Sequence, residues 1–189
     1  MARTRLGLFG GTFDPPHLGH VAAVRAAVAS GRYDVVLVTV AGDPYLKRER
    51  ESLSAPAIRL AMAHAAFGDI DSVDVSEREI GRPGPTYTVD TVRELRAEGY
   101  AVELLVGTDA ANSLPTWRDA TELCDIVTVG VFPRPHTVLT LDAPWRVVEI
   151  PMAPVDLSST GIRGENLDMS ALAALLPAGV IPLYLETQG

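Results

Sequence analysis

The chain has 189 residues, of which 47% are hydrophobic and 21% are charged, and its formal net charge is −8. This composition is that of an ordinary globular protein and excludes a disordered chain, a collagen and a disulfide scaffold. The acidic balance also argues against a nucleic-acid binder or a binder of anionic membranes, because such proteins present a basic face. We therefore expect one domain over residues 1–189, with neither nucleic acid nor membrane as a partner.

The single Cys124 cannot form an intramolecular disulfide, and it precedes an apolar run. We interpret it as a small buried hydrophobic residue. The first ten residues lack the apolar core of a signal peptide, and no later run approaches the ~20 apolar residues that span a bilayer. These features predict a cytoplasmic protein.

Apolar strands and helices alternate along the chain. The run at 6–9 stops at Gly10-Gly11, a helix begins near residues 15–17 with its body at 21–29, and 35–40 forms a second strand. The later elements follow the same alternation, with helices at about 56–66 and 87–97, and strands near 73–75, 102–106, 126–131 and 147–150. This order predicts an α/β fold with a doubly wound parallel sheet that is covered on both faces.

Two segments depart from this alternation. The proline-rich region 132–154 has few periodic apolar positions, and we expect it to be irregular and mobile apart from its strand. Segment 169–184 has leucines at helical spacing and predicts a small C-terminal helical appendage. In doubly wound sheets ligands bind beyond the carboxyl ends of the strands, so segments 10–20, 41–47 and 107–109 should converge on one cleft.

The junction of the first strand and first helix carries the most informative motif, Gly10-Gly11-Thr12-Phe13-Asp14-Pro15-Pro16-His17-Leu18-Gly19-His20. Glycines let backbone N–H groups approach a phosphate, and a helix N-terminus favours an anion. His17 and His20 would share one face of the first helical turn and donate to phosphate oxygens. Two surface histidines beside an ordinary glycine turn are the alternative, and the combination of strand, turn, His-x-Gly-His and helix argues against it.

Three other kinds of binding site do not match this motif. A Walker A loop would need a Gly-Lys-Ser/Thr sequence, and a dinucleotide fingerprint would need three spaced glycines, and neither is present. A metal site built on the two histidines lacks further ligands at readable spacing. Chemistry on a phosphate is therefore the preferred interpretation.

The motif resembles the T/H-x-G-H signature of the nucleotidyltransferase superfamily, and the stretch 10–17 resembles bacterial nicotinate-nucleotide adenylyltransferases in particular. Further stretches match that family in the same order, namely Gly84-Pro85-Thr86-Tyr87-Thr88-Val89-Asp90-Thr91, Val106-Gly107-Thr108-Asp109, Trp117 and Leu157-Ser158-Ser159-Thr160-Gly161-Ile162-Arg163. The resemblance covers nearly the whole chain and implies a Rossmann-like nucleotidyltransferase fold.

The resemblance assigns the ATP site. His17, His20 and Arg163 are implied to be catalytic, and ATP binding is implied for a larger set: Gly10, Gly11, Thr12, Phe13, His17, His20, Gly107, Asp109, Ser159, Thr160, Ile162 and Arg163. The residues alone allow other roles for part of this set. Stretch 157–163 could be a helix capping box, and Asp109 could cap the helix that follows it instead of accepting from a ribose hydroxyl.

The same resemblance implies a mononucleotide site formed by Lys47, Thr86, Tyr87, Trp117 and Arg134. Aromatic faces can stack on a flat nicotinate ring, although Tyr87 and Trp117 could equally be core residues. Leu46 stands where many family members have a histidine, so the acceptor pocket can differ from theirs.

The resemblance implies AMP transfer from ATP to nicotinate mononucleotide, which gives deamido-NAD and pyrophosphate in NAD biosynthesis. Mg²⁺ should bridge the ATP phosphates and keep most of its waters, so we expect no dedicated metal-binding residue. The alternatives are a transferase of the same superfamily with another acceptor, such as nicotinamide mononucleotide, and a non-catalytic nucleotide sensor. Oligomers occur in this family, so a homo-oligomer is compatible with the resemblance.

Overall fold

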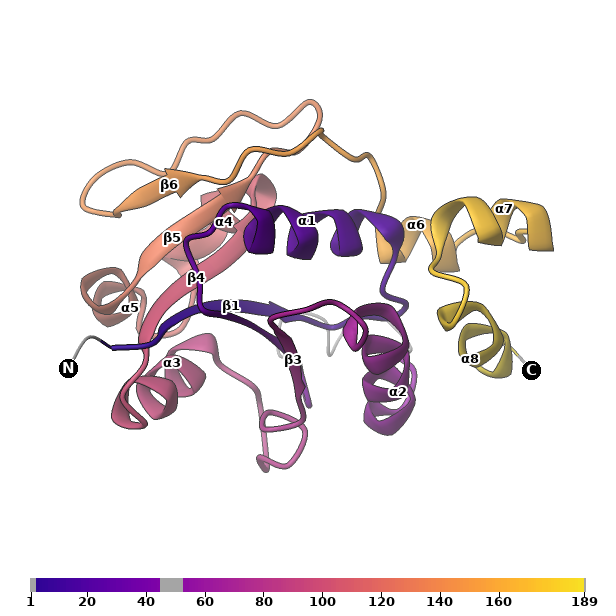
Figure 1. Ribbon diagram of the computed structural model, residues 1–189, viewed down its shortest axis with the longest axis horizontal. Helices are drawn as coiled ribbons and strands as arrows, with labels where there is room; N and C mark the ends of the chain where they lie inside the picture. Colours follow the sequence, from indigo (N-terminus) through magenta and orange to yellow (C-terminus); the bar gives the residue numbers. More distant parts are fainter. Residues whose placement is uncertain (1–2, 45–52, 189) are drawn as a thin grey trace.

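A parallel sheet of six strands forms the centre of the molecule in the computed structural model, which describes residues 3–44 and 53–188 (Figure 1). The strands are β1 (Arg5–Gly11), β2 (Val35–Val40), β3 (Val73–Ser76), β4 (Ala101–Gly107), β5 (Thr128–Phe132) and β6 (Val147–Glu149). Their order is β3-β2-β1-β4-β5-β6, and each neighbouring pair is parallel. The strand order reverses between β1 and β4, which is where ligands bind in doubly wound sheets.

Helices cover both faces of this sheet, as the sequence predicts. They are α1 (Leu18–Ala29), α2 (Pro56–Phe67), α3 (Thr88–Ala97), α4 (Thr108–Ser113), the 3-10 turn η1 (Leu114–Thr116), α5 (Ala120–Ile126), α6 (Ser159–Arg163), α7 (Met169–Leu175) and α8 (Val180–Glu186). Helices α1 and α2 share one apolar cluster with the sheet, and α3, α4 and α5 share a second one. Figure 1 shows α1 and α3 on opposite sides of β1.

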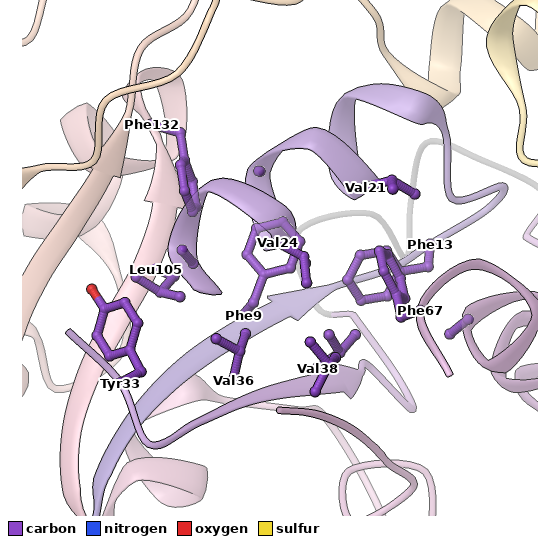
Figure 2. Close-up of a cluster of buried hydrophobic side chains, with 14 of the residues drawn as sticks. Phe9, Phe13, Val21, Val24, Tyr33, Val36, Val38, Phe67, Leu105 and Phe132 are labelled. Atoms are coloured by element: carbon purple, nitrogen blue, oxygen red, sulfur yellow. The ribbon is translucent and has the colours of Figure 1, made fainter. Parts of the chain in front are cut away.

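The first cluster lies between α1 and the centre of the sheet (Figure 2). Phe9 on β1 contacts Phe13 and Phe132, with ring centroids 5.8 Å away in both pairs. Val24 of α1 and Val38 of β2 are fully buried beside these rings. This packing fixes the turn between β1 and α1 against the sheet, and that turn carries the glycine and histidine motif.

The C-terminal appendage consists of α7 and α8, which share a third apolar cluster with α6 and with Met62 of α2, and α8 lies beside α2 (Figure 1). The sequence predicts one helical segment at 169–184, but the structure contains two helices there. Pro177 is the reason, because a proline disfavours helical backbone at the preceding residue. Leu176 accordingly adopts an extended conformation, with φ −114° and ψ 147°.

Other boundaries also differ from the sequence-based expectation. Strand β1 continues through Gly10 and Gly11, which pair with Thr39 and Val40 of β2 where the sequence predicts a turn. Helix α1 begins at Leu18 with His17 as its N-cap, so Pro15 and Pro16 precede the helix. Strand β5 begins at Thr128, because Ile126 still belongs to α5. Among the described residues, no helix combines the length and the apolar character that crossing a membrane requires.

Candidate active site

Two adjoining cavities open at the carboxyl ends of β1 and β4. The larger one, of about 360 Å³, is lined by residues that include His17, Gly19, His20, Asp109 and Arg134. The smaller one has about 170 Å³. The residues that line both cavities are Gly10, Gly11, Thr12, Val106 and Trp117. The end of β1 at Gly10 and Gly11, together with Thr12, therefore lines two cavities that could each hold one molecule.

His17 and His20 stack face to face in the larger cavity, with ring centroids 3.7 Å from each other and an angle of 25° between the rings. A Cβ atom at Gly19 would lie 3.0 Å from Nδ1 of His17 and 3.2 Å from Cγ1 of Val155. Glycine at this position thus leaves the imidazole undisturbed, which explains the glycine between the two histidines.

The tautomer of the neutral His20 ring follows from one hydrogen bond. The backbone N–H of His17 donates to Nδ1 of His20 over 3.2 Å, so Nδ1 is an acceptor. In the neutral ring the proton therefore resides on Nε2, which is a donor. The rings of Phe9 and Phe13 meet His20 edge-on at 6.2 Å and 5.2 Å and hold its ring plane.

His17 is held neutral by its surroundings. Burial, and secondarily the positive charge of Arg134, lowers the pKa of His17 from 6.5 to about 4. Its Nδ1 is buried and has no hydrogen-bond partner among the described residues. Near neutral pH, His17 can therefore act as a hydrogen-bonding group without adding a charge to the site.

The lowered pKa of His17 predicts acid-sensitive stability. The unfolded chain takes up a proton on this residue as the pH falls below 6.5, whereas the folded chain does so only near pH 4. The contribution is therefore fully present above pH 6.5 and is lost between pH 6.5 and 4, by roughly 3 kcal/mol at most. Urea unfolding of wild type and His17→Gln at pH 7.5 and pH 5 should show a smaller pH difference for the variant.

His64→Gln is the control variant. It removes an exposed histidine and so measures any general effect of losing a histidine. An unchanged pH difference in His17→Gln would contradict the assignment of the acid sensitivity to His17.

Asp109, at the start of α4, lines the larger cavity together with the histidines. The Oγ1 of Thr137 donates to its carboxylate over 2.9 Å, and Nε of Arg134 lies 3.4 Å away. The side chain of Asp109 is 60% exposed, so its oxygens are still accessible to a ligand hydroxyl. Asp109 therefore both anchors segment 134–137 and presents a carboxylate to the cavity.

Arg134 is directed by the backbone of the segment before α6. Its Nη1 donates to the carbonyl oxygens of Leu157 and Val155 over 2.7 Å and 3.3 Å. The resemblance implies a role for Arg134 at the mononucleotide, whereas the structure places it on the wall of the larger cavity, with the residues assigned to ATP. Its guanidinium lies close enough to His17 to influence the pKa of that ring.

The start of α6 is attached to the turn that precedes α1. Ser159 donates from Oγ to the carbonyl oxygen of Pro15 over 2.9 Å, and Arg163 donates from Nη1 to that of Asp14. Ser158 caps the helix by accepting from the N–H of Gly161 over 3.1 Å. Ser158 is therefore the N-cap of α6, and the contacts of Ser159 and Arg163 bring the start of this helix next to the histidine motif.

The smaller cavity contains two of the residues that the resemblance assigns to the mononucleotide, Thr86 and Trp117. Thr86 is held to the end of β2 by two bonds, one from its N–H to the carbonyl oxygen of Asp43 at 2.9 Å and one from the N–H of Asp43 to its Oγ1 at 3.1 Å. The indole N–H of Trp117 donates to Oγ of Ser113 over 2.9 Å, which fixes the ring plane at the cavity wall.

Other predicted site residues occupy different places. The ring of Tyr87 packs against the second apolar cluster, with the guanidinium of Arg118 5.3 Å from its centroid. Phe13 and Ile162 are core residues, 2% and 4% exposed. Lys47 and the neighbouring Leu46 lie outside the described residues.

Sequence reasoning missed two buried charged residues at this site, Glu79 and Arg59. Glu79 lines the smaller cavity and accepts from Oγ1 of Thr91 over 2.7 Å, and burial raises the pKa of its carboxyl. Arg59 is 1% exposed in α2. Its signal is present in the sequence, because Arg59 lies four and eight residues before two fully buried residues of the same helix, Ala63 and Phe67.

No group of three or more His, Cys, Asp or Glu side chains that could hold a metal ion occurs within residues 3–44 and 53–188. The larger cavity presents imidazoles, a guanidinium and the carboxylate of Asp109. This donor set suits a metal ion that arrives on a phosphate chain and keeps its waters, rather than one held by a protein cage.

Comparisons with known proteins agree with this site. Residues 8–165 match the family model described as cytidylyltransferase-like. A protein of Bordetella petrii named "Probable nicotinate-nucleotide adenylyltransferase" is 39% identical, over 98% of this chain and 97% of its own, and one of the same name from Roseiflexus sp. is 34% identical over 100% and 98%.

The fold is also found among solved structures. The structure of Plasmodium falciparum nicotinic acid mononucleotide adenylyltransferase complexed with NaAD matches with a TM-score of 0.79 at 15% identity, over 98% of this chain and 96% of its own. The structure of the same protein complexed with APC gives a TM-score of 0.76. The site geometry, the family model and these relatives together show that the chain belongs to the cytidylyltransferase-like family and, within it, to the nicotinate-nucleotide adenylyltransferases.

Proposed function

We propose that the protein transfers AMP from ATP to nicotinate mononucleotide and releases pyrophosphate. The observation that carries this proposal is the pair of adjoining cavities that share Gly10, Gly11 and Thr12. A transferase with two anionic substrates needs two compartments that meet at the reacting phosphates, and a sensor of one nucleotide needs only one. The names of the relatives supply the identity of the two substrates.

We assign ATP to the larger cavity. His17 and His20 lie on the wall that follows the glycine turn, where they would donate to oxygens of the α- and β-phosphates. Asp109, which lines the same cavity, would accept from a ribose hydroxyl. Ser159, Thr160 and Arg163, which the contacts with residues 14 and 15 hold beside the histidine motif, would bind the outer phosphates.

We assign the mononucleotide to the smaller cavity, which Thr86 and Trp117 line. The fixed indole plane of Trp117 would stack on the pyridine ring, an interaction that contributes ~1 kcal/mol beyond burial. Arg134 lies across the shared turn from this cavity, so it would act on the phosphates at the junction of the substrates. Lys47 is assigned to the mononucleotide by resemblance alone.

The reaction proceeds by direct displacement in this proposal. A phosphate oxygen of the mononucleotide attacks the α-phosphorus, the bond from that phosphorus to the oxygen that bridges to the β-phosphate breaks, and pyrophosphate leaves with those electrons. The attacking oxygen is already anionic, so no general base is required. The protein's task is to align two anions and to stabilise the added charge at the α-phosphate, for which neutral His17 and the Nε2 donor of His20 are placed.

Mg²⁺ belongs to this proposal as a companion of ATP. When bound, it neutralises part of the charge on the phosphate chain. The donor set of the larger cavity fits an ion carried by the nucleotide, since Asp109 is the one carboxylate among the described residues that line it.

Isotopic labelling tests the proposal. With ATP labelled at the α-phosphate, the label should appear in a dinucleotide of the mass of deamido-NAD, and with ATP labelled at the γ-phosphate it should appear in pyrophosphate. Label that appears in free AMP or in inorganic phosphate would show hydrolysis instead of transfer and would refute the assigned reaction.

A further inference from the structure

The guanidinium of Arg59 is buried beside the turns that follow β1 and β2. Arg59 belongs to the first turn of α2 and is 1% exposed. Arginine is protonated at any physiological pH, and a buried charge is tolerated only when hydrogen bonds compensate for the lost water. Burial lowers the pKa of Arg59, and the charge of Asp14 opposes that effect. This residue is therefore a buried cation next to a buried carboxylate.

The guanidinium donates to four backbone carbonyl oxygens. Nη1 donates to Thr12 over 2.9 Å and to Ala41 over 2.6 Å, Nη2 donates to Gly42 over 3.0 Å, and Nε donates to Ser54 over 3.0 Å. These carbonyls come from the turn after β1, from the turn after β2 and from the residues before α2. One side chain thus joins three segments that are remote in the sequence.

Asp14 reinforces the same junction. Its Oδ2 accepts from the N–H of Ser54 over 3.0 Å, while Arg59 binds the carbonyl oxygen of Ser54. Asp14 is 1% exposed, and its backbone carbonyl accepts from Arg163. Asp14 and Arg59 therefore bind the N–H and the carbonyl group of Ser54, and they connect Ser54 to the histidine motif.

The joined residues face the two substrates of the proposed reaction. Thr12 lines both cavities, and Ala41 lines the smaller one. The backbone carbonyl groups that follow the carboxyl ends of the strands place partial negative charge at the edge of the sheet where anions bind. A guanidinium that donates to four such carbonyl oxygens reduces this repulsion and fixes the distance between the two turns.

We propose that Arg59 is a positioning residue for adenylyl transfer, which sets the spacing between the turn at Thr12 and the turn at Ala41 and Gly42. The inference rests on the proposed function, because these turns are assigned there to ATP and to the mononucleotide. Arg59 contacts neither cavity as a lining residue, so it acts through the backbone that it holds. Reactions between aligned groups lose rate steeply when their spacing changes, so its loss should reduce kcat.

The test compares Arg59→Lys with Met62→Ala. Lysine keeps the positive charge, but its single ammonium group has at most three donors and cannot reproduce four bonds from a planar fork. Met62 is fully buried in the same helix and packs on the C-terminal appendage, so its variant is destabilised without losing contacts to the turns. Each variant is assayed with ATP and nicotinate mononucleotide well below its Tm, and amide hydrogen exchange is measured at residues 10–14 and 41–44.

We expect kcat to fall about tenfold or more in Arg59→Lys, with faster exchange in both turns, while Met62→Ala loses Tm but keeps kcat and slow exchange. A variant Arg59→Lys with wild-type kcat and wild-type exchange in both turns would overturn the inference. If wild-type protein does not release pyrophosphate with nicotinate mononucleotide, the proposed function fails, and the exchange comparison still decides whether Arg59 holds the two turns.

Discussion

His20→Ala should lower kcat on the order of 10²-fold or more, while the Kd of Mg·ATP changes far less. The reason lies in the fixed orientation of the ring, whose Nδ1 accepts from the N–H of His17 and whose plane is held by Phe9 and Phe13. Nε2 then offers a pre-oriented donor to the α-phosphate oxygen, where negative charge increases in the transition state. Single-turnover rates and calorimetric titration with ATP separate the two effects.

Two further variants serve as a control and as a partial rescue in this measurement. His64→Ala removes an exposed histidine from α2 and should leave both quantities unchanged. His20→Asn keeps a short donor side chain and should recover part of the lost rate. A loss of rate in His20→Ala that is matched by an equal loss of ATP affinity would show that His20 acts in the ground state only.

Phe13→Ala should destabilise the fold by roughly 3–5 kcal/mol, because large buried aromatic side chains leave a cavity of that cost. Phe13 is 2% exposed, and its ring meets that of Phe67 edge-on, with centroids 5.4 Å away (Figure 2). It also meets the ring of His20 edge-on, with centroids 5.2 Å away. A Cβ atom at Gly11 would lie 2.7 Å from this ring, so the backbone at Gly11 packs directly against the ring of Phe13. Urea unfolding at pH 7.5 measures the loss.

Phe67→Ala is the matched control, because Phe67 is fully buried and contacts Phe13 in the same cluster. Both variants should lose stability, and only Phe13→Ala should also lower kcat at a temperature where each protein is folded, since only Phe13 supports the ring of His20. Equal kcat values in the two variants would show that the edge contact does not orient His20.

The order of elements was predictable because each strand is a short apolar run and each run is followed by a helical segment or a glycine turn. The doubly wound parallel sheet follows from that alternation, and the structure confirms it. Boundaries were less predictable, since they depend on single residues in three dimensions. Ile126 has strand-like character but ends α5, and Pro177 divides the C-terminal appendage into two helices.

Sequence reasoning located the site residues that belong to an unusual motif. His17 and His20, which follow two glycines at the junction of a strand and a helix, are the examples. The structure brings both into one cavity with Asp109. The buried charges were missed because Arg and Glu side chains are mostly exposed in proteins, although the spacing of Arg59 to Ala63 and Phe67 places it on the buried face of α2. The resemblance assigns Arg134 to the mononucleotide, but this residue lines the larger cavity, because its direction depends on the carbonyl groups of residues 155 and 157.

The central claim concerns the reaction and its acceptor, and pyrophosphate release from Mg·ATP tests it most directly. Purified protein is supplied in parallel with nicotinate mononucleotide, nicotinamide mononucleotide and phosphopantetheine, and His20→Ala is assayed beside wild type in each case. We expect the fastest release with nicotinate mononucleotide, and its loss in the variant. Measurable ATP binding without release for any of the three acceptors, or faster release with one of the other two, would contradict the claim.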